Sequence, residues 1–210
     1  MAHRFLNIAT TANVRDAQIA NGSRAAYAQL ENGETTHDQL GAVEAEFIAA
    51  RDSFYMASVS QTGWPYIQHR GGPAGFLRVL DPYTLGFADY RGNRQYISLG
   101  NIAGDDRVAL FLMDYPNRRR LKLLGRASAH DLTADPGLTK QLLTAPYKAV
   151  TERGFRIHVE AFDWNCSQHI TPRFSESLLG SALTRIREKM ADLEAENKQL
   201  RARLSLMAER

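Results

Sequence analysis

The chain has 210 residues, a hydrophobic fraction of 44% and a formal net charge of +3. This length indicates one domain with a short appendage, and the hydrophobic fraction suffices for a sizeable core. The mild positive charge tolerates an anionic ligand without requiring nucleic acid. Cys166 is the only cysteine, which excludes an intramolecular disulfide and agrees with a cytoplasmic location. The sequence contains neither the long apolar run of a transmembrane helix nor that of a signal peptide.

The first part of the chain is expected to be an N-terminal arm, residues 1–37, with one short helix over 23–30. Thr36 begins a T-x-x-Q match to a helix capping box. Apolar residues then follow at helical spacing, which predicts an amphipathic helix over 38–51.

The middle of the chain changes to the period of β-strands. Three hairpins are predicted, pairing 54–60 with 65–70, 76–81 with 85–90, and 107–114 with 119–131. A turn and a short helix over 91–104, a helix over 136–147 and a strand over 155–164 complete this part.

Six or seven strands with short connections predict a mainly β (α+β) fold, an antiparallel split β-barrel with flanking helices. The helix between the fourth and fifth strands is expected to plug one opening of the barrel. A doubly wound fold would need alternating helices, which the pattern does not provide. The barrel is expected to span residues 38–174 and a C-terminal helix residues 175–210.

The C-terminal segment has the clearest periodicity in the chain. Apolar residues alternate at spacings of four and three from Leu179 to Met207, an a/d seam of about four heptads interrupted by Asn197. This pattern predicts a parallel coiled coil between two copies over 179–207, with Lys189 facing Glu194 and Glu196 facing Arg201 across the pair. The alternative is a single helix packed on its own barrel.

Four segments contain side chains suited to a ligand. A glycine turn places Asn93, Arg94 and Gln95 at an expected helix start, where free N–H groups and arginine bind anions. The alternative is an ordinary capped helix with a solvated arginine. The glycines after Arg70 allow the backbone to approach a ligand closely, or form a bulge or wide loop.

The other two segments lie on later strands. Arg120 and Lys122 share one strand face and could contact a phosphate or a ring carbonyl, or form a solvated edge. Trp164 and Gln168, in a segment with Asn165, His169 and Arg173, suit a planar ring ligand. The sequence offers too few partner residues for a catalytic Cys166 or for a metal site at His158 and Glu160. The dinucleotide-binding, P-loop and nucleophile-elbow motifs are absent from the sequence.

Four fragments follow one another in the chain: PYIQHRGGPAGF, LGFADYRGNRQYISLGNI, DDRVALFLMD and RRLKLLGRA. In this order they resemble the pyridoxamine-5'-phosphate-oxidase-like FMN-binding split barrels. The resemblance covers residues 40–130 and extends more loosely to 174. The resemblance implies a homodimer with FMN at the subunit interface and a small-molecule substrate, with no nucleic acid or membrane partner. The residues that it implies for FMN binding are His69, Arg70, Gly71, Ala88, Asp89, Asn93, Arg94, Gln95, Arg120, Lys122, Trp164 and Gln168.

Within that set, Arg70 and the 93–95 segment are expected at the phosphate, with Arg78 as an alternative to Arg70. Ala88 and Asp89 would run along the flavin, Arg120 would reach the isoalloxazine, and Trp164 would approach from the other subunit. The chain departs from true pyridoxamine-phosphate oxidases at its end, where residues 168–173 lead into the coiled coil instead of a substrate-phosphate motif. The expected function is therefore an FMN-dependent oxidoreductase with an unknown substrate. The alternatives are a binding or sensor protein without turnover, which could hold deazaflavin or haem, and a coiled-coil scaffold.

Overall fold

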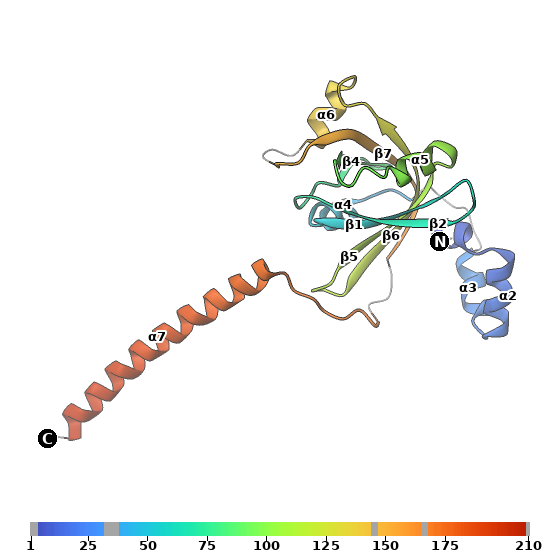
Figure 1. The fold of residues 1–210 in the computed structure, drawn as a ribbon. Helices are drawn as coiled ribbons and strands as arrows, with labels where there is room; N and C mark the ends of the chain where they lie inside the picture. The colour runs from blue at the N-terminus through green and yellow to red at the C-terminus, as the bar shows by residue number, and fades with distance from the viewer. Residues whose placement is uncertain (1–3, 32–37, 144–146, 165–167, 209–210) are drawn as a thin grey trace. The chain divides into compact units, whose positions relative to one another are not determined.

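A computed structural model describes residues 4–31, 38–143, 147–164 and 168–208. The chain forms two compact units: residues 1–114 with 118–169, and residues 170–210 with 115–117. The first unit contains the sheet and the N-terminal helices, and the second contains the long C-terminal helix (Figure 1).

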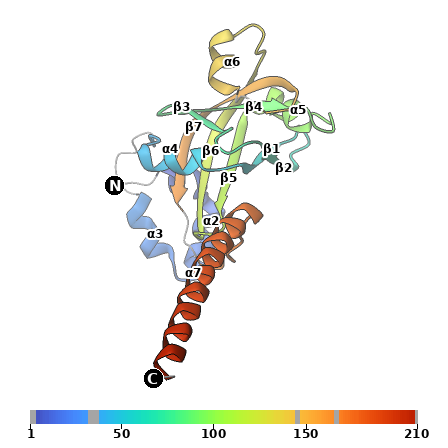
Figure 2. The same ribbon diagram turned by 90° about the vertical axis from the view of Figure 1, so that its left-hand side faces the viewer.

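The expected barrel is present in the first unit. Seven strands form one antiparallel sheet in the order β2-β1-β5-β6-β7-β4-β3. Their bounds are β1 Ser53–Val59, β2 Pro65–Gly71, β3 Arg78–Asp81, β4 Thr84–Tyr90, β5 Arg107–Asp114, β6 Arg119–His130 and β7 Thr151–Trp164. The sheet curls into a split barrel, and its edge strands are β2 and β3 (Figure 2). The predicted mainly β split barrel and its three hairpins are confirmed.

The barrel interior is filled by large apolar side chains. Strand β5 alternates strictly between buried and less buried residues, as expected for a strand with one face on a core. Phe54 lies 5.3 Å from Phe87, and Phe87 stacks on Phe155 at 5.0 Å, measured between ring centroids. These contacts join β1, β4 and β7, so strands distant in the sequence share one aromatic core.

The bend of the sheet between β6 and β7 depends on a glycine. The register of this strand pair shifts between Leu124 and Gly125. A Cβ atom at Gly125 would lie 2.5 Å from the carbonyl oxygen of His158. Only glycine allows the two backbones to approach this closely at the bulge.

Three helices flank the sheet at sites close to those expected. Helix α4 covers Ala42–Ala49, α5 covers Ile97–Gly104 and α6 covers Pro136–Leu142. Helix α4 is shorter than the predicted 38–51, and Thr36, where the capping box was expected, lies outside the described residues. The N–H of Gly41 instead donates to the Glu44 carboxylate at 3.0 Å. Helix α5 joins β4 to β5 and contacts β1 and β6, while α6 lies against β3, β4 and β7 (Figure 1).

The N-terminal segment contains more helix than expected. The predicted helix over 23–30 is α3, Arg24–Glu31, and two further helices precede it, α1 (Arg4–Ala9) and α2 (Ala12–Ala20). Thr11 caps α2 by accepting a hydrogen bond from the backbone of Val14. Arg4 donates to the Glu160 carboxylate at 2.8 Å, so α1 is attached directly to β7. The two extra helices were missed because their mixed polar sequences show no strong apolar periodicity.

The second unit consists mainly of helix α7, Glu176–Ala208, which confirms a long C-terminal helix. Within the described part of the chain, no helix combines the length and apolar character needed to span a bilayer.

Candidate functional site

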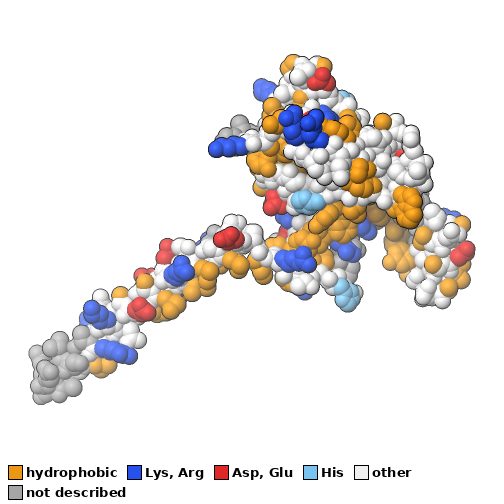
Figure 3. All heavy atoms as spheres, viewed as in Figure 1, with side chains coloured by type: hydrophobic (Ala, Val, Ile, Leu, Met, Phe, Trp, Pro, Cys, Tyr) orange, Lys and Arg blue, Asp and Glu red, His pale blue; other side chains and the backbone are white. Residues whose placement is uncertain are grey.

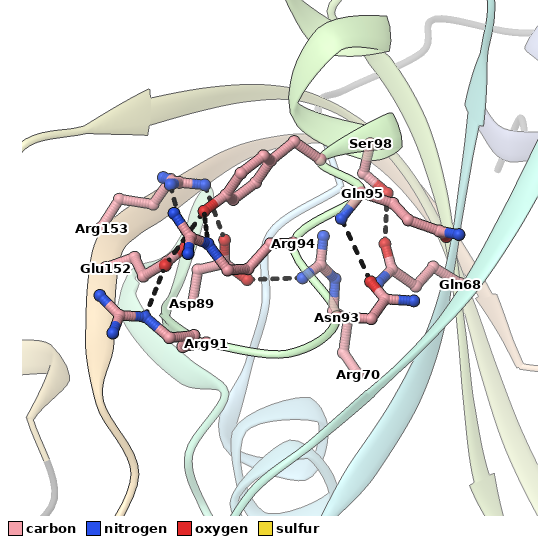
Figure 4. A network of polar contacts seen from close by, with 11 residues as sticks. Gln68, Arg70, Asp89, Arg91, Asn93, Arg94, Gln95, Ser98, Glu152 and Arg153 are labelled. Carbon is pink, nitrogen blue, oxygen red and sulfur yellow. Dashed lines mark hydrogen bonds and ion pairs between the residues drawn. The ribbon is translucent and has the colours of Figure 1, made fainter.

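A polar pocket of about 290 Å³ lies beside the start of α5, where β2, β4 and β7 come together (Figure 4). It brings together predicted residues from two segments: Arg70 from one, and Asp89 with the 93–95 triplet from the other. Sequence reasoning did not single out the remaining lining residues, which are Gln68, Tyr90, Gly92, Tyr96, Ser98, Leu99, Glu152 and Arg153.

At the base of the pocket, Asp89 lies between two arginines. Arg70 Nη1 is 2.5 Å from one oxygen of the Asp89 carboxylate, and Arg153 Nη1 is 3.3 Å from the other. Burial raises the pKa of Asp89, although both arginines oppose that shift. Burial likewise lowers the pKa of Arg70, against the attraction of Asp89. The Asp89 carboxylate is therefore paired on both sides, by Arg70 and by Arg153.

Arg70 is partly committed to the core, and one of its buried donors has no partner among the described residues. Its guanidinium lies 5.8 Å from the ring centroid of Phe87 and 5.6 Å from that of Phe155, within cation–π range. Its Nε is buried without a hydrogen-bond partner in the described structure. A buried donor without a partner is costly, so a ligand oxygen that reached it would be stabilised.

The wall of the pocket has a second charge centre at Glu152. The Glu152 carboxylate accepts from Arg91 Nε at 2.9 Å and from the Tyr96 hydroxyl at 3.1 Å. The hydrogen bond from Arg91 is the largest of several contacts that lower the pKa of Glu152. Because Arg91 and Arg153 both contact this carboxylate, it is neutralised from two sides.

Arg94 differs from the other arginines around the pocket. Its side chain is exposed, and its Nε donates to the Tyr96 hydroxyl at 3.3 Å. Within the described residues it makes no ion pair with a carboxylate, whereas Arg70, Arg91 and Arg153 each do. Arg94 therefore offers a positive charge and several N–H donors to an anion that enters the pocket.

The segment that presents Arg94 is a turn, not the helix start that was predicted. Helix α5 begins at Ile97, after Arg94 and Tyr96 have both adopted left-handed backbone conformations with φ of 62° and 53°. The Asn93 side chain accepts from the backbone N–H of Gln95 at 3.2 Å, which closes the turn. The expectation that residues 93–95 begin the helix was wrong by a few residues, because side-chain hydrogen bonding held the backbone in a turn. Non-glycine residues at positive φ are uncommon and concentrate at functional sites.

A chain of polar contacts supports the pocket from behind. The Ser98 hydroxyl donates to the Gln68 side chain at 2.8 Å, linking α5 to β2. One turn later, Asn101 donates to the buried Ser58 hydroxyl at 3.0 Å, linking α5 to β1. These two contacts fix α5 against the sheet and hold the 91–96 turn in place.

Three of the residues expected around the ligand point elsewhere. The His69 ring packs edge-on against Tyr55 at 5.5 Å, and His69 alternates along β2 with Gln68 and Arg70, so it lies on the opposite face of the strand. Gly71 ends β2 outside the pocket lining. The Ala88 side chain is buried in the small cluster around α6 with Leu138 and Leu142.

The residues expected at the flavin ring also lie outside the pocket lining. Lys122 makes an ion pair with Asp163 at 2.6 Å and covers the ring of Phe5 in α1. Arg120 keeps a buried Nε without a partner among the described residues and lies 5.5 Å from the Phe111 ring. Arg78, the alternative to Arg70, is on β3 and does not line the pocket.

Trp164 is engaged within its own barrel. Its indole N–H donates to Glu44 at 2.8 Å, and its ring meets Phe47 edge-on at 4.8 Å. Gln168 is exposed in a turn after β7, and Asn165 and Cys166 lie outside the described residues. The structure thus brings together the residues expected at a phosphate and leaves those expected at the ring away from them.

Residues 41–158, more than half of the chain, match the family model of pyridoxamine 5'-phosphate oxidase. The chain belongs to the pyridoxamine 5'-phosphate oxidase family. The matched region begins just before α4 and includes all of β1–β6, the pocket and the first half of β7. A search of curated proteins found no match to the chain.

Solved structures include similar barrels. A putative pyridoxamine 5'-phosphate oxidase from Lactobacillus delbrueckii is 22% identical, covers 60% of this chain and 94% of its own, and superposes with a TM-score of 0.46. A histidine-to-alanine variant of HupZ from Group A Streptococcus is 14% identical to this chain. The match covers 60% of this chain and 99% of HupZ, with a TM-score of 0.46. An FMN-binding protein from Syntrophomonas wolfei is 12% identical. The match covers 70% of this chain and 97% of that protein, with a TM-score of 0.43. At these identities and TM-scores, the likeness carries no information about the ligand of this chain.

Proposed function

We propose that this family member binds FMN, with the phosphate in the pocket beside α5. The observation that supports this most directly is Arg94, an exposed arginine without a carboxylate partner among the described residues, at the mouth of a pocket whose other arginines are paired. Arg70 would contribute its buried Nε, and the 93–95 turn would contribute side-chain donors. This donor set fits a dianionic phosphate and has no corresponding role for a neutral ligand.

The size of the pocket supports a division of FMN between two places. About 290 Å³ is at the lower limit of ligand pockets in general, enough for a phosphate and part of the ribityl chain. The isoalloxazine would therefore lie outside this pocket. We propose that it lies at the interface with a second copy, where Arg120, Trp164 and Gln168 are candidates for contact.

An exposed apolar surface supports the homodimer. Ile67 on β2 is 66% exposed, and Tyr55 on the neighbouring β1 lies on the same sheet face, diagonal to Ile67, and is 37% exposed. Phe111 is the partner of Tyr55 in the next ladder, so the apolar face continues onto β5. Figure 3 shows hydrophobic side chains gathered over this part of the barrel. A contiguous apolar face of this kind is typical of a surface that is covered by another protein.

Bound FMN would supply hydride and electron transfer, and we propose an oxidoreductase that acts on a small molecule. The chain itself would bind and orient the cofactor and its substrate. The charge of the pocket arginines would stabilise the phosphate, and the polar chain from Ser98 to Gln68 would keep the turn rigid.

The proposal is tested by titrating the purified protein with FMN and with riboflavin, following the quenching of flavin fluorescence. Because the proposed site recognises phosphate, FMN should bind at least about tenfold more tightly than riboflavin, the effect of one charge-assisted contact. Equal affinities would contradict the phosphate site. Oxidation of a reduced nicotinamide by the FMN-loaded protein would then separate an enzyme from a binding protein without turnover.

A further inference from the structure

Helix α7 displays an apolar stripe that no described residue of its own unit covers. Seven of its apolar residues are each 48–66% exposed, and they recur at the alternating spacing of a coiled-coil seam. They are Leu179, Leu183, Ile186, Met190, Leu193, Leu200 and Leu204. Figure 3 shows these hydrophobic side chains in a row along the helix. Long helices in water depend on the burial of such a face.

We propose that α7 pairs with α7 of a second copy of this chain, in parallel and in register. A shallow hollow along the helix is lined by Met190, Leu193, Glu194, Asn197, Lys198 and Arg201. All of these except Lys198 are at a, d or e positions, which the neighbouring helix covers in a coiled coil. The proposal rests on the tail alone and is independent of FMN binding.

The charges beside the seam fix the register. In a parallel pair without offset, Lys189 lies opposite Glu194 of the second copy, and Glu196 lies opposite Arg201. Two-fold symmetry repeats each contact, so four attractive pairs form and no like charges meet at these positions. A shift of one heptad in either direction would break these pairs and leave part of the seam uncovered.

The charges alone do not fix the direction of the partner helix. An antiparallel pair aligned so that Lys189 lies opposite Glu196 also sets Arg187 opposite Glu194, and both contacts are attractive. The other antiparallel alignment that covers most of the seam brings Glu194 against Glu194 and Glu196 against Glu196, which is repulsive.

Asn197 decides between the two remaining arrangements. It is the single polar residue within the described seam. In the parallel pair it faces Asn197 of the second copy, and the two amides can hydrogen-bond to each other. In the attractive antiparallel alignment it faces Ile186, which buries an amide without a hydrogen-bond partner in each copy and disfavours that arrangement. A single polar residue at an a position has this orienting effect in coiled coils.

Parallel pairing has a consequence for the barrels. Helix α7 is about 50 Å long, at 1.5 Å for each of its 33 residues. In a parallel pair the two helix starts are adjacent, and residues 170–175 span at most about 20 Å, so two barrels are held close together. An antiparallel pair would attach the barrels at opposite ends of the paired helices. The tail therefore raises the effective concentration of one barrel for the other.

Disulfide trapping in the full-length protein tests this proposal. Cys166 is replaced by serine, and two single-cysteine variants are made, L183C and L200C. Each variant alone is expected to form a disulfide-linked dimer under mild oxidation, since each position meets itself in a parallel pair. In a mixture where L200C carries a mass tag, no linked pair of L183C with L200C should form, because the positions are about 25 Å apart along the helix.

Two results would overturn the proposal. A linked pair that forms only between L183C and L200C would show the antiparallel arrangement. Failure of L200C to link to itself would show that the tails do not pair in register, even if the protein is dimeric by mass through its barrels. A matched variant combines L200C with N197L. Its L200C–L200C disulfide should form less efficiently, because the seam loses the polar residue that favours the parallel pair. Circular dichroism should show that the helix remains folded.

Discussion

Replacing Arg94 with alanine is the sharpest test of the phosphate pocket, because this side chain can be removed without disturbing the fold. Arg94 is exposed and contacts the Tyr96 hydroxyl at 3.3 Å, so its loss breaks no buried ion pair. Hydrogen bonds to charged groups contribute about 1.5–3 kcal/mol. Removing this contact with phosphate should therefore weaken FMN binding by about 10- to 150-fold.

The comparison with riboflavin isolates the phosphate contribution. R94A should leave riboflavin affinity unchanged, and R94K should bind FMN with intermediate affinity, because lysine keeps the charge but lacks the forked donors. The assay is fluorescence titration at fixed ionic strength, with R185A on the tail as a control that should not change FMN affinity. If R94A weakens FMN and riboflavin equally, or neither, the assignment of Arg94 to the phosphate is refuted.

Three further predictions concern the stability of the pocket and of the barrel. D89A should lower the free energy of unfolding by about 3–5 kcal/mol in urea titrations, because it leaves Arg70 buried with its charge uncompensated, and D89N should lose less; an unchanged midpoint for D89A would show that the pair contributes little. The contacts of Arg4 and Arg126 lower the pKa of Glu160 from its ordinary 4.5, so its contribution to the docking of α1 is present above that pH and is lost as pH falls through the lower, folded value; the protection of α1 amides from hydrogen exchange, relative to the intrinsic rate at each pH, should fall on acidification below about 4.5, and R4A should show low protection at every pH. G125A should destabilise the barrel by about 1–3 kcal/mol, since its new methyl group meets a β7 carbonyl oxygen, and thermal unfolding at the wild-type midpoint would contradict that clash.

The sequence was sufficient for the parts of the fold that depend on local pattern. The strict alternation in 107–114 and the turn residues between the hairpins predicted β5 and its neighbours, since buried and exposed positions alternate with the pleat. The helix start was misplaced because Asn93 and Arg94 resemble a helix N-terminus, whereas their side chains and a positive φ at Arg94 hold a turn.

The composition of the pocket could not be read from local pattern. Arg153 meets Asp89 because β4 pairs with β7 in one particular register, and that register is set by the whole barrel. The same holds for Glu152, which lies in β7 but before the start of the strand expected over 155–164. Trp164 was expected at a ligand because an aromatic beside polar residues suits a ring, but in its own barrel it serves as a packing contact for α4.

The most direct measurement of the central claim is an absorbance spectrum of the protein as purified, followed by acid release and identification of any chromophore. We expect bands typical of an oxidised flavin and the release of FMN in a ratio approaching one per chain. A colourless protein that also fails to take up added FMN would contradict this expectation, and release of haem or a deazaflavin would show that the pocket holds a different cofactor.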